Sequence, residues 1–128
     1  MARQFVVQLE NRPGALAELA RTLAAGGIDI RQLAAGGMGA VGYAVVETDA
    51  DEATSAAFRA AGIPFISGEP VLVTVPDRPG ALATVADRLG VAGIDVAAVM
   101  VVGRREGDME IALIVDDMTE ARRVLGIE

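Results

Sequence analysis

The sequence contains one short motif twice, and its residue types suit the binding of a small polar ligand. The two copies, separated by 66 residues (77 − 11), are Asn11-Arg12-Pro13-Gly14-Ala15-Leu16 and Asp77-Arg78-Pro79-Gly80-Ala81-Leu82. Proline suits the first turn of a helix, and apolar residues follow at helical spacing, so each motif is predicted to begin a helix. A helix N-terminus attracts anions such as carboxylates, and glycine allows close approach to the backbone. The two motifs are therefore candidate binding loops.

Each residue of the motif also has a purely structural interpretation. Asn11 and Asp77 belong to the residue types that cap helices, and Gly14 and Gly80 suit tight turns. Both arginines of the motif could simply face solvent. Asp77 adds a negative charge that disfavours a nearby carboxylate and favours an ammonium group, so the two loops need not be equally competent.

The composition removes most catalytic chemistry. The chain has no His and no Cys, and all 11 basic residues are Arg, so Lys is absent as well. The usual proton shuttle, thiolate nucleophile, Schiff-base amine and common metal ligands are therefore missing. Ser, Thr, Tyr43 and carboxylates remain, and no activating base stands out beside them. We expect no enzyme activity, no catalytic residue, no metal site and no cofactor; an enzyme that uses only carboxylates is the weakest alternative.

Charge and hydropathy exclude two further classes of partner. The net charge of −7 opposes the phosphate backbone of nucleic acids. No apolar run approaches the ~20 residues that span a bilayer, and the first four residues lack the pattern of a signal peptide. We expect a cytoplasmic protein that binds neither nucleic acid nor membrane.

The duplication predicts two units of one α+β fold, at residues 1–68 and 69–128. In the first, β-branched or alternating runs predict strands at 3–9, 28–31, 41–47 and 65–67, with helices from Pro13 and from Asp49. In the second, strands are expected at 71–75, 94–102 and 109–115, and the last strand is not evident. The order βαββαβ is that of a ferredoxin-like antiparallel sheet with strand order four, one, three, two. Loss of the fourth strand would leave the second unit's first strand as an unpaired edge.

Two local patterns require interpretation. Asp49 with Glu52 has the spacing of a capping box, and Asp117 with Glu120 repeats it at an offset of 68 (117 − 49), which predicts two residues added in the second hairpin. Three glycines, at positions 37, 39 and 42, match a dinucleotide-binding spacing but precede a strand instead of a helix, so they predict a hairpin turn. Met38 and Tyr43 near that turn could line a pocket or serve as ordinary packing.

The strand, the motif, the helix, a second shared segment and the hairpin together resemble the ACT domain, twice, over nearly the whole chain. The second shared segment is Gly27-Ile28-Asp29-Ile30 and its repeat Gly93-Ile94-Asp95-Val96. The chain resembles in particular small tandem ACT proteins that carry no catalytic domain. The resemblance implies that ferredoxin-like units pair side by side and bind an amino-acid effector between them. It implies as ligand-binding residues Asn11, Arg12, Pro13, Gly14, Ala15, Leu16, Asp77, Arg78, Pro79, Gly80, Ala81 and Leu82, and, from a partner unit, Asp29 and Asp95.

The leading hypothesis is a non-catalytic, allosteric regulatory protein, expected as a homodimer, that binds a small amino acid. The alternative is an interaction subunit, similar to the small subunit of acetohydroxyacid synthase, that docks on an enzyme of amino-acid biosynthesis. At residue level, Asp29 and Asp95 could instead satisfy the loop that follows the first helix of each copy. The sequence leaves these interpretations open.

Overall fold

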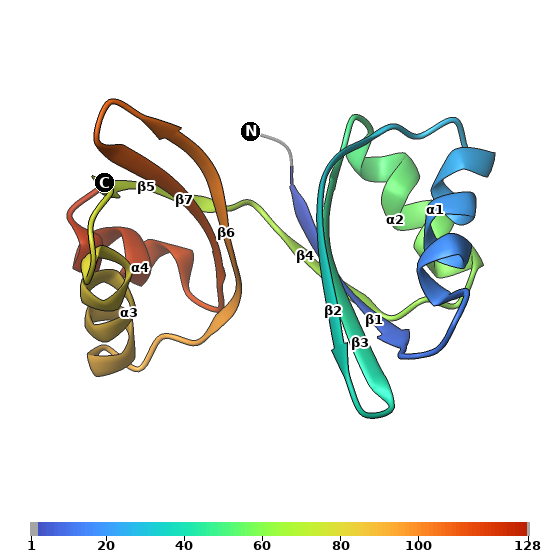
Figure 1. Ribbon diagram of the computed structural model, residues 1–128, viewed down its shortest axis with the longest axis horizontal. Helices are drawn as coiled ribbons and strands as arrows, with labels where there is room; N and C mark the ends of the chain where they lie inside the picture. Colours follow the sequence, from blue (N-terminus) through green and yellow to red (C-terminus); the bar gives the residue numbers. More distant parts are fainter. Residues whose placement is uncertain (1–2, 128) are drawn as a thin grey trace. The chain divides into compact units, whose positions relative to one another are not determined.

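The computed structural model describes residues 3–127 and divides into two compact units, Met1–Glu69 and Pro70–Glu128. In each unit two helices cover one face of one antiparallel sheet (Figure 1). Among the described residues, no helix has the length and apolarity required to cross a membrane.

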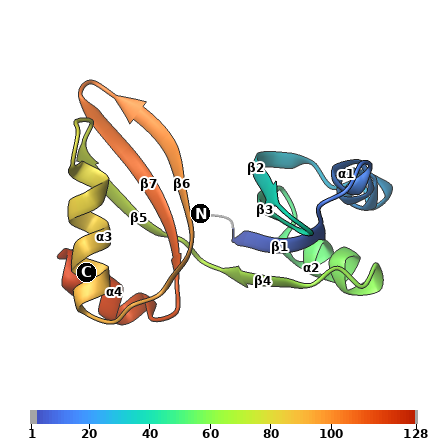
Figure 2. The ribbon, with the colours of Figure 1, turned by 60° about the horizontal axis from the view of Figure 1, so that its bottom comes forward.

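Unit 1 has the complete βαββαβ order. Its elements are β1 (Gln4–Glu10), α1 (Ala15–Ala25), β2 (Ile30–Met38), β3 (Val41–Thr48), α2 (Asp51–Ala60) and β4 (Phe65–Gly68). The strand order is β2-β3-β1-β4, and every neighbouring pair is antiparallel. Figure 2 shows β4 beside β1 at one edge. This is the predicted ferredoxin-like sheet.

Unit 2 repeats the arrangement without the last strand. Its elements are β5 (Val71–Pro76), α3 (Ala81–Val91), β6 (Val96–Arg105), β7 (Asp108–Val115) and α4 (Met118–Leu125). The strand order is β5-β7-β6. Within residues 70–127, β5 is an edge strand, in the place where β1 of unit 1 pairs with β4. The predicted short sheet is confirmed.

Each core lies between the sheet and its two helices. Leu19 and Leu23 of α1 are buried, and so are Val85 and Leu89 of α3, at the helical spacing that the sequence pattern indicated. In unit 1 these side chains meet a cluster of three rings, in which Phe58 lies 5.9 Å from Phe5 and 5.5 Å from Phe65 between centroids. Unit 2 packs without rings, on Val, Ile, Leu and Met side chains.

Strand pairing corrects the expected size of the insertion. Gly42 pairs with Leu9 and Gly37, and Met109 pairs with Val75 and Arg104, so β3 matches β7 at an offset of 67 (109 − 42). One residue has been added, not two. The register of β6 shifts between Val101 and Gly103, where β2 has no corresponding shift. The added residue is therefore a β-bulge in β6.

The predicted capping box at Asp49 is wrong. Ala50 occupies the N-cap of α2 and makes no side-chain cap, while Asp49 Oδ1 accepts a hydrogen bond from Asp29 N at 3.0 Å. Asp116 does the same for Asp95 N, also at 3.0 Å, so Asp116 is the structural match of Asp49. At Asp117 the N-cap half of the prediction is confirmed, because its Oδ1 accepts from Glu120 N, while the Glu120 carboxylate pairs with Arg123. At Asp49 the side chain thus bonds the distant Asp29 N–H and not the first turn of α2.

We predict that Phe58→Ala will destabilise the protein by about 3–5 kcal/mol, because the ring is fully buried between two others and its loss leaves a cavity. Urea unfolding followed by circular dichroism measures this difference. Val91→Ala is the control, since that side chain is 88% exposed and should change stability by less than about 0.5 kcal/mol. Equal losses in the two variants would contradict the assignment of the core.

Candidate functional site

The first motif forms a tight turn from β1 into α1. Gly14 is the N-cap of α1 and has φ of 90°, a left-handed conformation that favours glycine, and Ala15 N donates to Arg12 O at 3.2 Å. Asn11 N donates to Ala40 O, and Asn11 Nδ2 donates to Gly39 O, both at 3.0 Å. The side chain of Asn11 is thus attached to the tip of the β2–β3 hairpin and does not cap the helix.

The second motif has the same backbone and a different side-chain partner. Gly80 has φ of 89° at the N-cap of α3, and Asp77 N donates to Gly107 O in the tip of the β6–β7 hairpin at 2.7 Å. The Asp77 carboxylate accepts from Arg104 Nε at 3.1 Å. The capping interpretation of Asn11 and Asp77 is therefore wrong in both copies, whereas the turn interpretation of the two glycines is confirmed.

A hollow of about 250 Å³ opens beside the first motif. Four motif residues contribute to it, together with residues of the three neighbouring strands. Its lining is Leu9, Glu10, Asn11, Arg12, Ala15, Leu16, Ala35, Gly36, Gly37, Gly42 and Tyr43. Pro13 and Gly14 form the turn outside this lining. The structure thus gathers Asn11, Arg12, Ala15 and Leu16 around one depression. Tyr43 contributes to it and Met38 does not.

In unit 2 a hollow of about 370 Å³ lies against the β6–β7 hairpin. Its lining is Thr74, Gly103, Arg104, Arg105, Glu106, Asp108, Met109 and Glu110. No residue between Asp77 and Leu82 belongs to this hollow, so the motif residues Arg78, Pro79 and Ala81 do not line it, whereas four motif residues line the hollow of unit 1.

Arg12 is held by two carboxylates. Its Nη2 atom lies 2.7 Å from Glu18 Oε2, and its Nε atom lies 2.9 Å from Glu10 Oε2. The hydrogen bond to Glu18, and then that to Glu10, raises the pKa of Arg12 above its ordinary value. Its charge is thus already compensated, so a ligand carboxylate gains little from it. In the second copy Pro76 and Thr84 replace these carboxylates, and Arg78 forms no ion pair among residues 3–127.

Backbone donors remain available at the start of α1. Glu18 N donates to Gly14 O as the first intrahelical bond of the turn, while the N–H groups of Leu16 and Ala17 have no acceptor within the described part of the chain. Leu16 lines the hollow. In the same part of the chain no cluster of three or more potential metal ligands is present.

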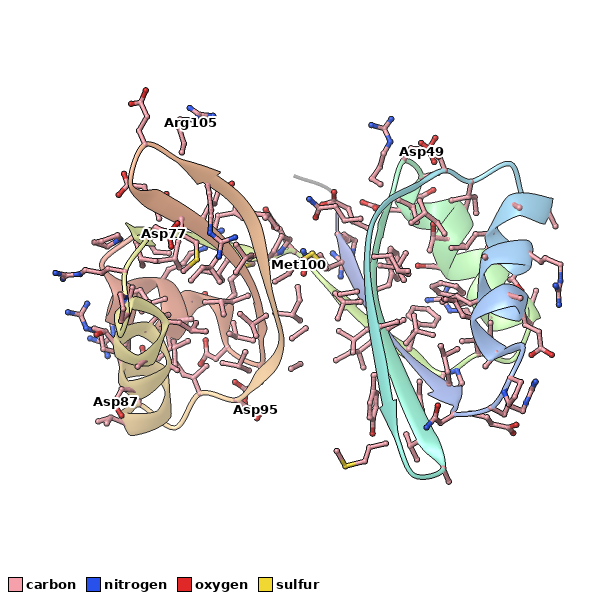
Figure 3. The ribbon with its side chains drawn as sticks, viewed as in Figure 1. Asp49, Asp77, Asp87, Asp95, Met100 and Arg105 are labelled. Atoms are coloured by element: carbon pink, nitrogen blue, oxygen red, sulfur yellow. The ribbon has the colours of Figure 1, made fainter. Side chains whose placement is uncertain are left out.

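Asp29 and Asp95 lie far from the loop of their own unit. Asp29 precedes Ile30, which pairs with Thr48 at one end of the hairpin, whereas Gly37 and the turn lie at the other end. The same separation holds in unit 2, and Figure 3 shows Asp77 and Asp95 at opposite ends of that unit. The backbone N–H groups of both aspartates donate to a carboxylate that follows the hairpin of their unit, that of Asp49 or Asp116. Within one unit, neither aspartate joins the motif residues.

Sequence reasoning missed two residues that shape the loops. Gly37 was interpreted as part of the turn, but it lies in β2, and the turn itself is Gly39 with Ala40. Arg104 lies outside the strands expected at 94–102 and 109–115, but it belongs to β6 and pairs with Asp77. The alignment of the two copies at an offset of 67 would have placed these two residues at one position.

No sequence family and no curated protein sequence matches the chain. Solved structures do. A protein from Bacteroides thetaiotaomicron has a TM-score of 0.70 and 22% identity, with 98% of this chain and 86% of that chain covered. The regulatory subunit of aspartate kinase from Thermus flavus has a TM-score of 0.66 and 15% identity, over 98% and 92%. The same subunit from Thermus thermophilus has a TM-score of 0.61 and 16% identity, over 98% and 88%. These likenesses confirm the predicted fold of two ferredoxin-like units.

We predict opposite effects of the same substitution at two glycines. Gly14→Ala should destabilise the protein by about 1–2 kcal/mol, because φ of 90° forces the new Cβ into a left-handed conformation. Gly90→Ala should stabilise it by about 0.5–1 kcal/mol, because Gly90 lies in helix α3 and a Cβ there meets nothing within 4 Å. Thermal unfolding measures both, and a stabilising Gly14→Ala would contradict the turn geometry.

Proposed function

We propose that this chain is a non-catalytic regulatory protein that binds a small amino acid at the loop between β1 and α1. The observation that carries the proposal is the hollow of unit 1, where four residues of the repeated motif meet. Its volume of about 250 Å³ is below the roughly 300–1,000 Å³ of pockets for drug-sized molecules, which suits a ligand of few atoms. The fold shared with two regulatory subunits of aspartate kinase supports a regulatory role.

The groups around the hollow suit a zwitterion. The N–H groups of Leu16 and Ala17 can donate to a carboxylate, at the positive end of the α1 dipole. Asn11 Oδ1 can accept from an ammonium group, since only Nδ2 of that side chain is bonded among residues 3–127. As the resemblance implies, Asp29 or Asp95 would contact the ammonium group only from a different unit or from a second copy of the chain.

The rest of the lining favours an uncharged ligand side chain. Leu9, Leu16 and Ala35 present apolar surface, and the single cation, Arg12, is already paired with Glu10 and Glu18. Because the ligand is small, its affinity should be modest, on the order of micromolar to millimolar, or about −4 to −8 kcal/mol.

We predict that one or a few of the twenty L-amino acids, all with uncharged side chains, will raise the melting temperature of the intact chain. A ligand that binds only the folded state at 100 times its Kd adds about 2.7 kcal/mol of stability. A thermal-shift panel measures this effect. The N-acetyl and carboxamide derivatives of the active amino acid should lose it, because each removes one charge of the zwitterion.

A panel without any shift, on protein shown to be folded by circular dichroism, would contradict amino-acid binding. A shift that survives both derivatives would contradict the zwitterion geometry. The D-enantiomer of the active amino acid is the control for nonspecific stabilisation, since it offers the same charges with the side chain displaced.

The second candidate function is a subunit that docks on a metabolic enzyme. The description of two structural neighbours as regulatory subunits favours it. Co-purification of an amino-acid-biosynthesis enzyme at a fixed stoichiometry would support this function, and it is compatible with effector binding. We expect the chain itself to form a homodimer in either case.

A further inference from the structure

The two units differ at the strand row that lies beneath the binding loop. In unit 1 this row is Leu9, Gly42 and Gly37, and in unit 2 strand pairing places Val75, Met109 and Arg104 at the same positions. Two glycines in one copy thus correspond to two long side chains in the other. The equivalence follows from the strand pairing of the two sheets.

In unit 1 the absence of side chains makes room for Asn11. A Cβ built on Gly37 would lie 2.7 Å from both Cγ and Oδ1 of Asn11, closer than any real contact. A Cβ on Gly42 would lie 3.3 Å from Gly36 O and 3.7 Å from Leu9 Cβ. The amide of Asn11 therefore lies directly over Gly37, and both glycines line the hollow beside it.

In unit 2 the same positions are filled. Met109 is only 8% exposed and belongs to the core of that unit. Arg104 replaces Gly37, and its Nε lies 3.1 Å from the carboxylate of Asp77, the residue that replaces Asn11. A guanidinium cation thus lies beside Asp77, where a ligand ammonium group would have to bind if this loop worked as proposed for unit 1. Figure 3 shows Asp77 in the half of unit 2 that carries the β6–β7 hairpin tip.

We propose that only the loop of unit 1 binds the amino acid, and that Gly37 and its counterpart Arg104 determine this difference. Arg104 acts as a built-in substitute for the ligand cation, and Met109 fills the space that Gly42 leaves open. The inference rests on the proposed function and specifies which copy performs it. The expected stoichiometry is one amino acid per chain.

The test introduces the unit 2 residue into unit 1. The twenty L-amino acids are applied singly to wild-type protein and to Gly37→Arg in a thermal-shift assay, and the active one is titrated by calorimetry. Gly37→Arg should lose the shift and the binding heat. Met38→Arg is the matched control, because it adds the same side chain one residue further along, at a position that is 88% exposed and outside the lining. It should retain both.

A second pair of variants examines the loops directly. Asp77→Ala breaks the ion pair of unit 2 and should leave affinity and stoichiometry unchanged, whereas Asn11→Ala should weaken binding. If Gly37→Arg fails to fold, as judged by circular dichroism, Gly37→Ala replaces it, because its Cβ already displaces the Asn11 side chain.

The outcomes separate this inference from the function on which it rests. If no amino acid binds to wild-type protein, both fail. If two amino acids bind per chain, if Gly37→Arg binds as well as wild type, or if Asp77→Ala weakens binding, the unit 1 assignment is overturned and the amino-acid-binding function stands. One site per chain that is lost in Gly37→Arg and kept in Met38→Arg supports the assignment.

Discussion

A backbone hydrogen bond joins each strand–helix loop to the tip of the neighbouring hairpin, and the geometry of both candidate sites depends on it. Asn11 N donates to Ala40 O, and Asp77 N donates to Gly107 O. This bond brings Asn11 beside β2 and Asp77 beside β6. The side chain of Asn11 therefore lies against Gly37, and that of Asp77 lies against Arg104. Gly14 or Gly80, at the N-cap, then redirects the chain so that the helix begins next to this contact. The same backbone therefore supports a loop that lines a hollow in unit 1 and a loop whose first residue pairs with an arginine in unit 2.

Each copy combines two residues that suit one another. In unit 1 the amide of Asn11 lies over Gly37, which leaves its acceptor oxygen and the neighbouring space open. In unit 2 the charge of the Asp77 carboxylate is neutralised by Arg104. The Asp77–Arg104 pair contributes little to stability, because Arg104 is 62% and Asp77 38% exposed, and exposed ion pairs typically add about 0–1 kcal/mol. The main consequence of this ion pair is local: the guanidinium of Arg104 takes up space beside Asp77 and compensates its charge. Arg12 is similarly neutralised by Glu10 and Glu18, so in the proposed site the backbone N–H groups of α1 are the donors for a ligand.

The sequence predicted what depends on periodicity and repetition. The helical stripes of Leu19 with Leu23 and of Val85 with Leu89 are buried as expected, and the missing strand falls at the predicted edge. It could not predict features that depend on partners far along the chain. Asp49 matches a capping pattern, yet its carboxylate accepts a hydrogen bond from the backbone N–H of Asp29, 20 residues earlier. The bulge in β6 lies within a run of apolar residues that gives both faces of the strand the same character. The hydrophobic pattern therefore does not fix the register of β6. Without that register, the sequence could not show that Arg104 occupies the position of Gly37.

Within residues 70–127, the unpaired edge formed by β5 is compatible with a stable sheet because the strand is short and bounded by proline. β5 spans only six residues, with Pro70 immediately before it and Pro76 at its end. Proline lacks the N–H that a further strand would need, so the row of groups open to pairing is interrupted at both ends. The inward residues Val71, Val73 and Val75 remain buried against α3 and α4 even without a fourth strand. Within residues 70–127, the core of unit 2 thus depends on two helices and three strands, and its inward side chains are buried without a fourth strand.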